Sequence, residues 1–272
     1  MTVVEQAGST HPGLREGENE DVIGWDEDNR LWLVADGMGG HASGQVASAI
    51  ARDVVLREAG NAGLDEMILA AHEEIRKQAE STPGQKGMGA TLVVARLRGT
   101  GMDIAWVGDS RAYLMRDGEL RQITVDHSFV EMLRARVGMS EEELRNHPQK
   151  HILTQTLGHD LPTPSASRLP LRDGDRLLLC SDGLNDEVAA PLIAEILRRD
   201  APLQDICDAL VEAALENGGS DNVSVVVIEY HGRSDPDAQP AVGATARGLL
   251  SSIAAGVGAA VAALLLFAWV LR

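Results

Sequence analysis

The chain has 272 residues and a formal net charge of −17, from 41 acidic and 24 basic side chains. Such a charge repels phosphate backbones and argues against nucleic acid as a partner. The two cysteines, Cys180 and Cys207, are too few for a disulfide framework or a cysteine-based zinc site. With 44% hydrophobic residues, the chain can bury one substantial core.

Six apolar runs along the chain predict β-strands. They are Leu31–Ala35, Thr91–Leu97, Met102–Val107, Ala112–Met115, Arg176–Cys180 and Val223–Glu229. Only a few residues separate the second run from the third and the third from the fourth. A parallel connection needs a dozen or more residues, so these neighbours are expected to form antiparallel hairpins.

Helical periodicity predicts four helices between or after these strands. They are Ser43–Glu58, Leu64–Ala79, Ser128–Arg136 and Leu203–Glu216. The pattern favours an α+β fold, with an antiparallel core and helices outside it, over a doubly wound parallel sheet.

Carboxylates stand at the ends of three of the predicted strands. Asp36 directly follows an apolar run, Asp182 follows another after one serine, and Asp221 shortly precedes a third. A buried strand holds a residue at its tip in a fixed place, so several such tips could converge on a cation. Carboxylate, carbonyl and water oxygens are the ligands that Mg²⁺ and Mn²⁺ select.

The C-terminal region differs from the rest of the chain. Leu249–Leu271 is a run of 23 residues without a charge, and about 20 apolar residues suffice to span a bilayer. We therefore expect a transmembrane anchor at residues 248–272, after a flexible linker at 231–247. The first residues do not resemble a secretory signal peptide. Together these features predict a single-pass tail anchor in the inner (plasma) membrane, with the globular part in the cytoplasm.

Seven short motifs follow one another between Thr10 and Tyr230. They are Asn19-Glu20-Asp21, Val34-Ala35-Asp36-Gly37-Met38-Gly39-Gly40-His41, Met88-Gly89-Ala90-Thr91-Leu92, Val107-Gly108-Asp109-Ser110-Arg111, Asp126-His127-Ser128, Ser181-Asp182-Gly183-Leu184 and Ser220-Asp221-Asn222-Val223. In this order they resemble the metal-dependent Ser/Thr protein phosphatases of the 2C type (the PPM family) in their compact bacterial form. The resemblance implies a four-layer α-β-β-α sandwich of two mostly antiparallel sheets, in a phosphatase domain at residues 1–230.

The resemblance also implies a binuclear Mn²⁺ or Mg²⁺ site, with a weaker third ion in bacterial members. The implied ligands of the ion pair are Asp36, Asp182, Asp221 and the carbonyl of Gly37. By the same resemblance, Asp21 holds metal-bound water, Glu20 assists it, and Asp126 binds the third ion together with Asp182. Asp109 is expected to be structural, because it ends a hairpin. Residues 137–158 are expected to form a flap beside the site, where substrate selectivity is set.

The chain departs from the family pattern at two positions. The arginine that binds the substrate phosphate normally stands four residues before the Glu of Asn-Glu-Asp, where this chain has Glu16; the candidate is Arg15, one place earlier. A candidate general acid of eukaryotic members is replaced here by Met38, as is common in bacterial members. The general acid therefore stays unassigned.

The implied activity is hydrolysis of phosphoserine and phosphothreonine by direct attack of a metal-bridging water, with Arg15, Asp21 and Asp36 as the catalytic residues. Phosphorylated proteins and a cognate Ser/Thr kinase are the expected partners. Two other functions stay open: a catalytically weak regulatory module that binds phosphoproteins, and a metal-dependent hydrolase of small phosphate compounds. The two Phe and two Tyr in the chain argue against the latter, because a base-stacking pocket needs aromatic rings. His147 and His151 resemble half a zinc site, but they lack the glutamate of the usual motif and are expected to lie on the flap surface.

Overall fold

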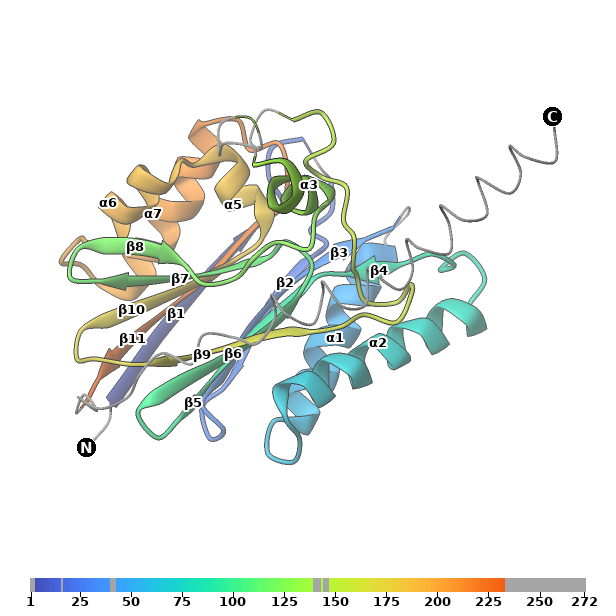
Figure 1. Cartoon of the computed structure of the whole chain (residues 1–272), viewed down its shortest axis with the longest axis horizontal. Helices are drawn as coiled ribbons and strands as arrows, with labels where there is room; N and C mark the ends of the chain where they lie inside the picture. Colours follow the sequence, from blue (N-terminus) through green and yellow to red (C-terminus); the bar gives the residue numbers. More distant parts are fainter. Residues whose placement is uncertain (1–2, 16, 40–42, 139–142, 144–146, 233–272) are drawn as a thin grey trace. The chain divides into compact units, whose positions relative to one another are not determined.

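The computed structural model describes residues 3–15, 17–39, 43–138, 143 and 147–232. The chain divides into two units, Met1–Pro240 and Ala241–Arg272, and every described residue belongs to the first. This unit contains two β-sheets with helices on their outer faces (Figure 1).

Every strand pair in the two sheets is antiparallel. One sheet has the order β1 (Val3–His11), β11 (Val223–His231), β10 (Asp175–Cys180), β7 (Arg111–Arg116) and β8 (Glu119–Gln122). The other has the order β2 (Asp21–Asp26), β3 (Leu31–Met38), β5 (Leu92–Arg98), β6 (Gly101–Val107) and β9 (Ser165–Pro170), and β4 (Gly89–Ala90) pairs with the end of β3.

The helices form two outer layers. The sheet that contains β3 packs against α1 (Ser43–Glu58) and α2 (Leu64–Ser81). The sheet that contains β11 packs against α5 (Asp182–Glu187), α6 (Ala190–Leu197) and α7 (Leu203–Glu216). A further helix, α3 (Phe129–Val137), follows β8. The layers confirm the expected α-β-β-α sandwich (Figure 1).

Three hydrophobic clusters fill the spaces between these layers, and the alternation of side chains along each strand explains them. Leu31 and Leu33 of β3 point toward α1 and α2, while Trp32 and Val34 pack between the two sheets. The strand is therefore buried on both faces. This is why the central strands read as unbroken apolar runs rather than as alternating patterns.

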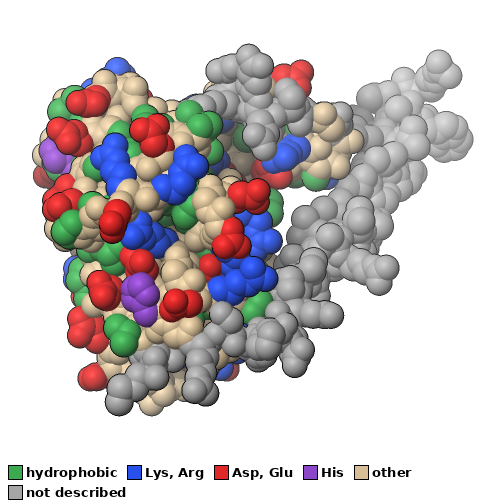
Figure 2. All heavy atoms as spheres, turned by 90° about the vertical axis from the view of Figure 1, so that its left-hand side faces the viewer, with side chains coloured by type: hydrophobic (Ala, Val, Ile, Leu, Met, Phe, Trp, Pro, Cys, Tyr) green, Lys and Arg blue, Asp and Glu red, His purple; other side chains and the backbone are tan. Residues whose placement is uncertain are grey.

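The six predicted strands and four predicted helices are all present, with ends that differ by a few residues. The sequence prediction did not include β1, β2, β4, β8, β9, α5 or α6. On the face drawn in Figure 2, acidic and basic side chains are interspersed, and they do not separate into large patches of one sign.

The predicted fold class is corrected on one point, the transmembrane helix. Within the residues that the structure describes, no helix combines the length and the apolar character that a bilayer span requires. Among those residues the fold is the sandwich alone. The predicted anchor at 248–272 and nearly all of the predicted linker lie outside the described residues. The inner-membrane location depended on that anchor and stays a prediction.

Candidate metal centre

Two aspartates face each other at one end of the β2–β3 pair. Asp21 is the first residue of β2, and it is in register with Asp36 near the end of β3. The backbone N–H of Gly37 donates a hydrogen bond of 3.1 Å to the carbonyl of Glu20, which extends the pairing past the end of the strand. Antiparallel register thus brings together two motifs that lie 15 residues apart in the chain.

The other sheet delivers two more aspartates to the same end. Cys180, the last residue of β10, is in register with Val225 near the start of β11. Asp182 follows β10 in the first turn of α5, and Asp221 precedes β11. The side chain of Glu187, at the end of α5, accepts hydrogen bonds from the backbone N–H and the hydroxyl of Ser220. The helix that carries Asp182 therefore also fixes the turn that leads to Asp221.

Hydrogen bonds made by the Ser181 and Asn222 side chains join the two sheets at this end. The Ser181 hydroxyl donates to Asp21 Oδ2 at 2.7 Å and accepts from the backbone N–H of Ser224 at 3.0 Å. The amide oxygen of Asn222 accepts from the backbone N–H of Glu20 at 2.7 Å. Its amide nitrogen donates to the carbonyls of Pro12 and Glu18, at 3.0 and 3.1 Å. These contacts explain why Ser and Asn flank the acidic residues in the motifs.

Two glycines permit close approach of the backbone around the aspartates. A Cβ added at Gly37 would overlap the carbonyl oxygen of Gly44, and one added at Gly183 would overlap the carbonyl oxygen of Asn222. Neither atom belongs to a flexible side chain, so a larger residue at either position requires the backbone to move. Close backbone contact therefore requires glycine at both positions, one near the end of β3 and the other in the first turn of α5.

Burial and mutual repulsion raise the pKa values of the clustered carboxyl groups. Burial raises the pKa of Asp21 to about 7, against hydrogen bonds from Ser181 and Ser224 that lower it. Burial, followed by repulsion from Asp21, raises the pKa of Asp36 well above its ordinary value. Burial, followed by repulsion from Asp109, does the same for the pKa of Asp182. Such a cluster is stable only when protonated or when neutralised by cations.

The donor set of this cluster fits divalent cations that prefer oxygen. Asp21 Oδ1 and Asp182 Oδ1 are both buried, and within the described residues neither has a hydrogen-bond partner. An orphaned anionic oxygen is costly in the absence of a cation. Carboxylate oxygens without competing nitrogen or sulfur suit Mg²⁺ and Mn²⁺. Asp21, Asp36, Asp182 and Asp221 could therefore hold such ions, with the Gly37 carbonyl beside them.

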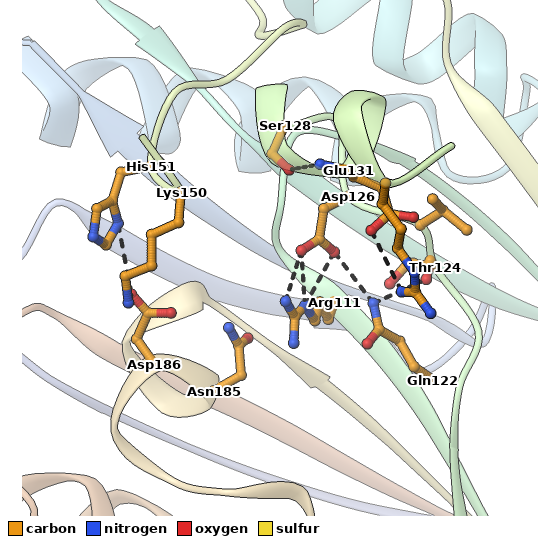
Figure 3. A network of polar contacts seen from close by, with 12 residues as sticks. Arg111, Gln122, Thr124, Asp126, Ser128, Glu131, Lys150, His151, Asn185 and Asp186 are labelled. Carbon is orange, nitrogen blue, oxygen red and sulfur yellow. Dashed lines mark hydrogen bonds and ion pairs between the residues drawn. The ribbon is translucent and has the colours of Figure 1, made fainter. Parts of the chain in front are cut away.

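Asp126, the predicted ligand of the third ion, lies in an ion pair. Arg111 Nη2 is 2.7 Å from Asp126 Oδ2, and Arg111 Nε donates to both carboxylate oxygens at 3.0 and 3.1 Å (Figure 3). Asp109, which the sequence led us to regard as structural, repels both Asp36 and Asp182, and burial raises its pKa to about 7. The structure thus favours Asp109 as the fifth acid of the cluster, with Asp126 adjoining it.

A cavity of about 420 Å³ adjoins the acidic cluster. Asp109 and Asp182 line it where it meets the cluster, and several apolar residues line it elsewhere: Leu120, Val130, Val188 and Ile193. Lys150 and His151 also line it, and the Lys150 ammonium lies 2.8 Å from Asp186 Oδ2 (Figure 3). His151, Asp182 and Asp186 could each offer a metal-ligating atom within 4.8 Å of the others. The Lys150 ammonium, paired with Asp186, already supplies a positive charge to these three side chains.

The two remaining predicted site residues lie at the border of the cluster. An oxygen of the Glu20 carboxylate lies against Gly44, in the first turn of α1, where a helix favours negative charge. Arg15 is exposed, in the loop between β1 and β2. This loop is held near Asp221, because Gly13 packs against the Asp221 carbonyl and the Leu14 N–H donates to the Gly219 carbonyl at 2.7 Å.

Comparison with known proteins decides the family. The family model described as "Protein phosphatase 2C" matches residues 14–224. This range includes all the acidic residues described above and every strand except β1 and most of β11. The chain belongs to the protein phosphatase 2C family. The predicted resemblance is thereby confirmed.

Relatives in this family include the Ser/Thr protein phosphatase PstP of Mycobacterium tuberculosis, 39% identical over 246 residues. That match covers 86% of this chain and 47% of PstP, so the chain spans about half the length of PstP. The Ser/Thr phosphatase stp of Listeria monocytogenes is 37% identical over 235 residues, 81% of this chain and 93% of the relative.

Solved structures of protein phosphatases 2C share the fold. The crystal structure of the catalytic domain of PstP in complex with two manganese ions matches with a TM-score of 0.78 and 35% identity, over 85% of this chain and 100% of that one. The phosphatase MsPP of Mycobacterium smegmatis, in complex with cacodylate, matches with a TM-score of 0.76 and 32% identity, over 84% and 98%.

Proposed function

We propose that this chain is a Mn²⁺- or Mg²⁺-dependent protein Ser/Thr phosphatase. The observation that carries the proposal is the convergence of Asp21, Asp36, Asp182 and Asp221 from two sheets, with two buried carboxylate oxygens that have no partner among the described residues. The family match over residues 14–224 and the manganese ions in the PstP structure support the same activity.

Each side chain of the cluster has a distinct part in this proposal. Asp36, Asp182 and Asp221 would hold the ions, and Asp21 stays oriented by its hydrogen bond from Ser181. Bound there, the ions would supply an activated water and electrostatic stabilisation of the phosphoryl group. Because the pKa values of Asp21, Asp36 and Asp182 are raised, protons compete with cations for these carboxyl groups near neutral pH. Cation binding and deprotonation are therefore coupled.

The substrate in this proposal is a phosphoserine or phosphothreonine of another protein, and a Ser/Thr kinase that modifies the same proteins is the expected counterpart. Arg15 is the cation proposed to bind the phosphate, since its loop is attached to the turn before Asp221. Its guanidinium can form paired hydrogen bonds with phosphate oxygens.

The test is phosphate release from a phosphothreonine peptide by the whole chain, with Mn²⁺ and with EDTA. We expect turnover that EDTA abolishes and that Asp36→Asn lowers by about 100-fold or more. Asp117→Asn is the matched control, because it removes an aspartate whose side chain is 82% exposed in the β7–β8 turn. Turnover that persists in EDTA would contradict the metal requirement.

The same assay separates the proposal from the regulatory alternative, which is motivated by Glu16 at the usual arginine position. A folded protein that binds Mn²⁺ and the phosphopeptide but releases no phosphate would be a binding module. Release from para-nitrophenyl phosphate without release from any phosphopeptide would instead favour a hydrolase of small phosphate compounds.

A further inference from the structure

The turn that carries Asp109 is held on one side by Thr91, the residue between β4 and β5. This turn, residues 108–110, joins β6 to β7, and the Ser110 hydroxyl lies 2.7 Å from the Thr91 hydroxyl. Thr91 in turn donates its backbone N–H to the carbonyl of Asp36 at 2.8 Å. Gly108 has a φ of 100°, and an added Cβ would lie 2.5 Å from Thr91 Cβ. The turn therefore packs tightly on this side.

On its other side, the turn is held by His127. The backbone N–H of His127 donates to the carbonyl of Gly108 at 2.9 Å, and the backbone N–H of Gly108 donates to His127 Nδ1 at 3.2 Å. The ring stacks on Trp106, with ring centres 6.2 Å apart and planes inclined by 22°. Two hydrogen bonds in opposite directions thus fix the residue immediately before Asp109.

The hydrogen bonds determine the tautomer of the His127 ring. Because Nδ1 accepts from Gly108, the ring proton is on Nε2, which lies 2.9 Å from the Ser165 hydroxyl at the start of β9. Both ring nitrogens are therefore engaged within the protein. Neither is available to a substrate or a metal ion, so any effect of His127 on the reaction must act through the residues that it holds.

We propose that His127 is a positioning residue for Asp109: its paired hydrogen bonds with Gly108 fix the turn that places Asp109 in the wall of the cavity that Asp182 also lines. This inference rests on the proposed function, because it assigns Asp109 to the set of residues that hold the ions. His127 would then orient a metal ligand through hydrogen bonds without itself touching the metal ion.

The test compares three substitutions, two at His127 and one at its partner Ser165. His127→Asn retains an acceptor bonded to Cγ, where Nδ1 stands, while His127→Ala removes both ring hydrogen bonds and Ser165→Ala removes only the partner of Nε2. The matched control is His72→Ala, since buried His72 likewise accepts a glycine N–H at Nδ1, from Gly158 at 3.1 Å. Mn²⁺ alone is titrated by calorimetry into each metal-free protein, and thermal unfolding in EDTA is measured in parallel.

We expect His127→Ala to weaken the weakest Mn²⁺ site by about 10–100-fold. His127→Asn and Ser165→Ala should stay within a few-fold of the unmodified protein. His72→Ala should lower the unfolding temperature in EDTA without weakening Mn²⁺ binding. Unchanged Mn²⁺ binding by folded His127→Ala, or equal weakening by His72→Ala, would overturn the inference.

A double-mutant cycle with Asp109→Asn tests whether His127 acts through Asp109. If it does, the loss of Mn²⁺ affinity in the double variant will be no larger than in Asp109→Asn alone, because residues in one network are not additive. Additive losses would overturn the inference while leaving the proposed function intact. Unmodified protein that binds Mn²⁺ but has no phosphatase activity would contradict the proposed function only, and failure to bind Mn²⁺ would overturn both.

Discussion

The Ser181 hydroxyl donates a hydrogen bond of 2.7 Å to Asp21 Oδ2, and so links the end of β10 in one sheet to the start of β2 in the other. The two residues are 160 positions apart in the chain. Ser181 is fully buried, and its oxygen also accepts the N–H of Ser224. The serine of the Ser-Asp-Gly motif therefore orients a carboxylate that belongs to a different motif.

We expect Ser181→Ala to weaken Mn²⁺ binding by about 10–100-fold, because Asp21 loses the donor that orients it. It should also lower the free energy of unfolding by about 1–3 kcal/mol, since the buried N–H of Ser224 loses its acceptor. Mn²⁺ titration and urea denaturation measure the two effects. Ser81→Ala is the control, because its exposed hydroxyl bonds only within α2. Equal effects of the two substitutions would refute this role of Ser181.

The stability of the metal-free protein should fall as the pH rises from about 4 to about 7. The pKa values of Asp21 and Asp109 are raised from 3.8 to about 7, so the folded state binds more protons than the unfolded state in this interval. By linkage, the stabilisation from their protonated forms is complete below 3.8 and is lost as the pH passes 7.

Burial lowers the pKa of His127 from 6.5 to about 4, and this group has the opposite effect between those values. We expect the carboxyl groups to prevail, because the pKa values of Asp36 and Asp182 are raised as well. Unfolding temperatures in EDTA at pH 5 and pH 7.5 measure the difference, and saturating Mn²⁺ should reverse its sign. A higher unfolding temperature at pH 7.5 in EDTA would contradict the prediction.

Gly183→Ala should abolish most of the activity. The added methyl group would overlap the carbonyl of Asn222, so the turns that carry Asp182 and Asp221 would have to separate. We expect a loss of activity of about 100-fold or more, as for other displacements of catalytic groups by about 1 Å. Gly17→Ala serves as the control, since nothing lies within 4 Å of the Cβ that it would add. Phosphate release at saturating Mn²⁺ compares the two variants.

Arg15→Ala should raise the KM for a phosphothreonine peptide by about 10–100-fold, because a hydrogen bond to a charged group contributes about 1.5–3 kcal/mol. The affinity for Mn²⁺ should not change, since Arg15 is exposed in the loop outside the carboxylate cluster. Steady-state kinetics at fixed Mn²⁺ measure the first effect and calorimetry the second. An unchanged KM would remove Arg15 from substrate binding.

The sequence predicted those elements whose residues are buried on both faces. β3 contains the apolar run Leu31–Ala35 and β10 contains Leu177–Cys180, and their predicted positions are confirmed. β1 is an edge strand in which only Ala7 is buried, so its mixed sequence, Val3–His11, has neither a clear alternation nor an apolar run. Its pairing with β11 over nine residues is a tertiary effect that local pattern does not encode.

For the candidate site, the sequence predicted the carboxylates at strand tips and interpreted Asp109 as structural, whereas in the structure Asp109 lines the same cavity as Asp182. A short Gly-Asp-Ser turn between two strands has the pattern of an ordinary hairpin, and that pattern gave no sign of an acidic neighbour. Asp109 follows β6 and Asp182 follows β10, and these two strands come to one cavity only in the folded protein. The pairing of Asp126 with Arg111 could likewise be seen only after folding, although both residues lie in motifs that the sequence singled out.

The cluster draws its carboxylates from both layers of the sandwich, Asp21 and Asp36 from one sheet and Asp182 and Asp221 from the other. Ions bound between them would link the two sheets, and the side chains packed between the sheets would set the distance between the two pairs of carboxylates. Trp32 and Leu177 belong to that inner packing layer. Because Mg²⁺ requires nearly ideal octahedral geometry, trimming such a side chain far from the acids would change which ion the protein accepts. We therefore expect metal selectivity in this fold to depend partly on the hydrophobic core.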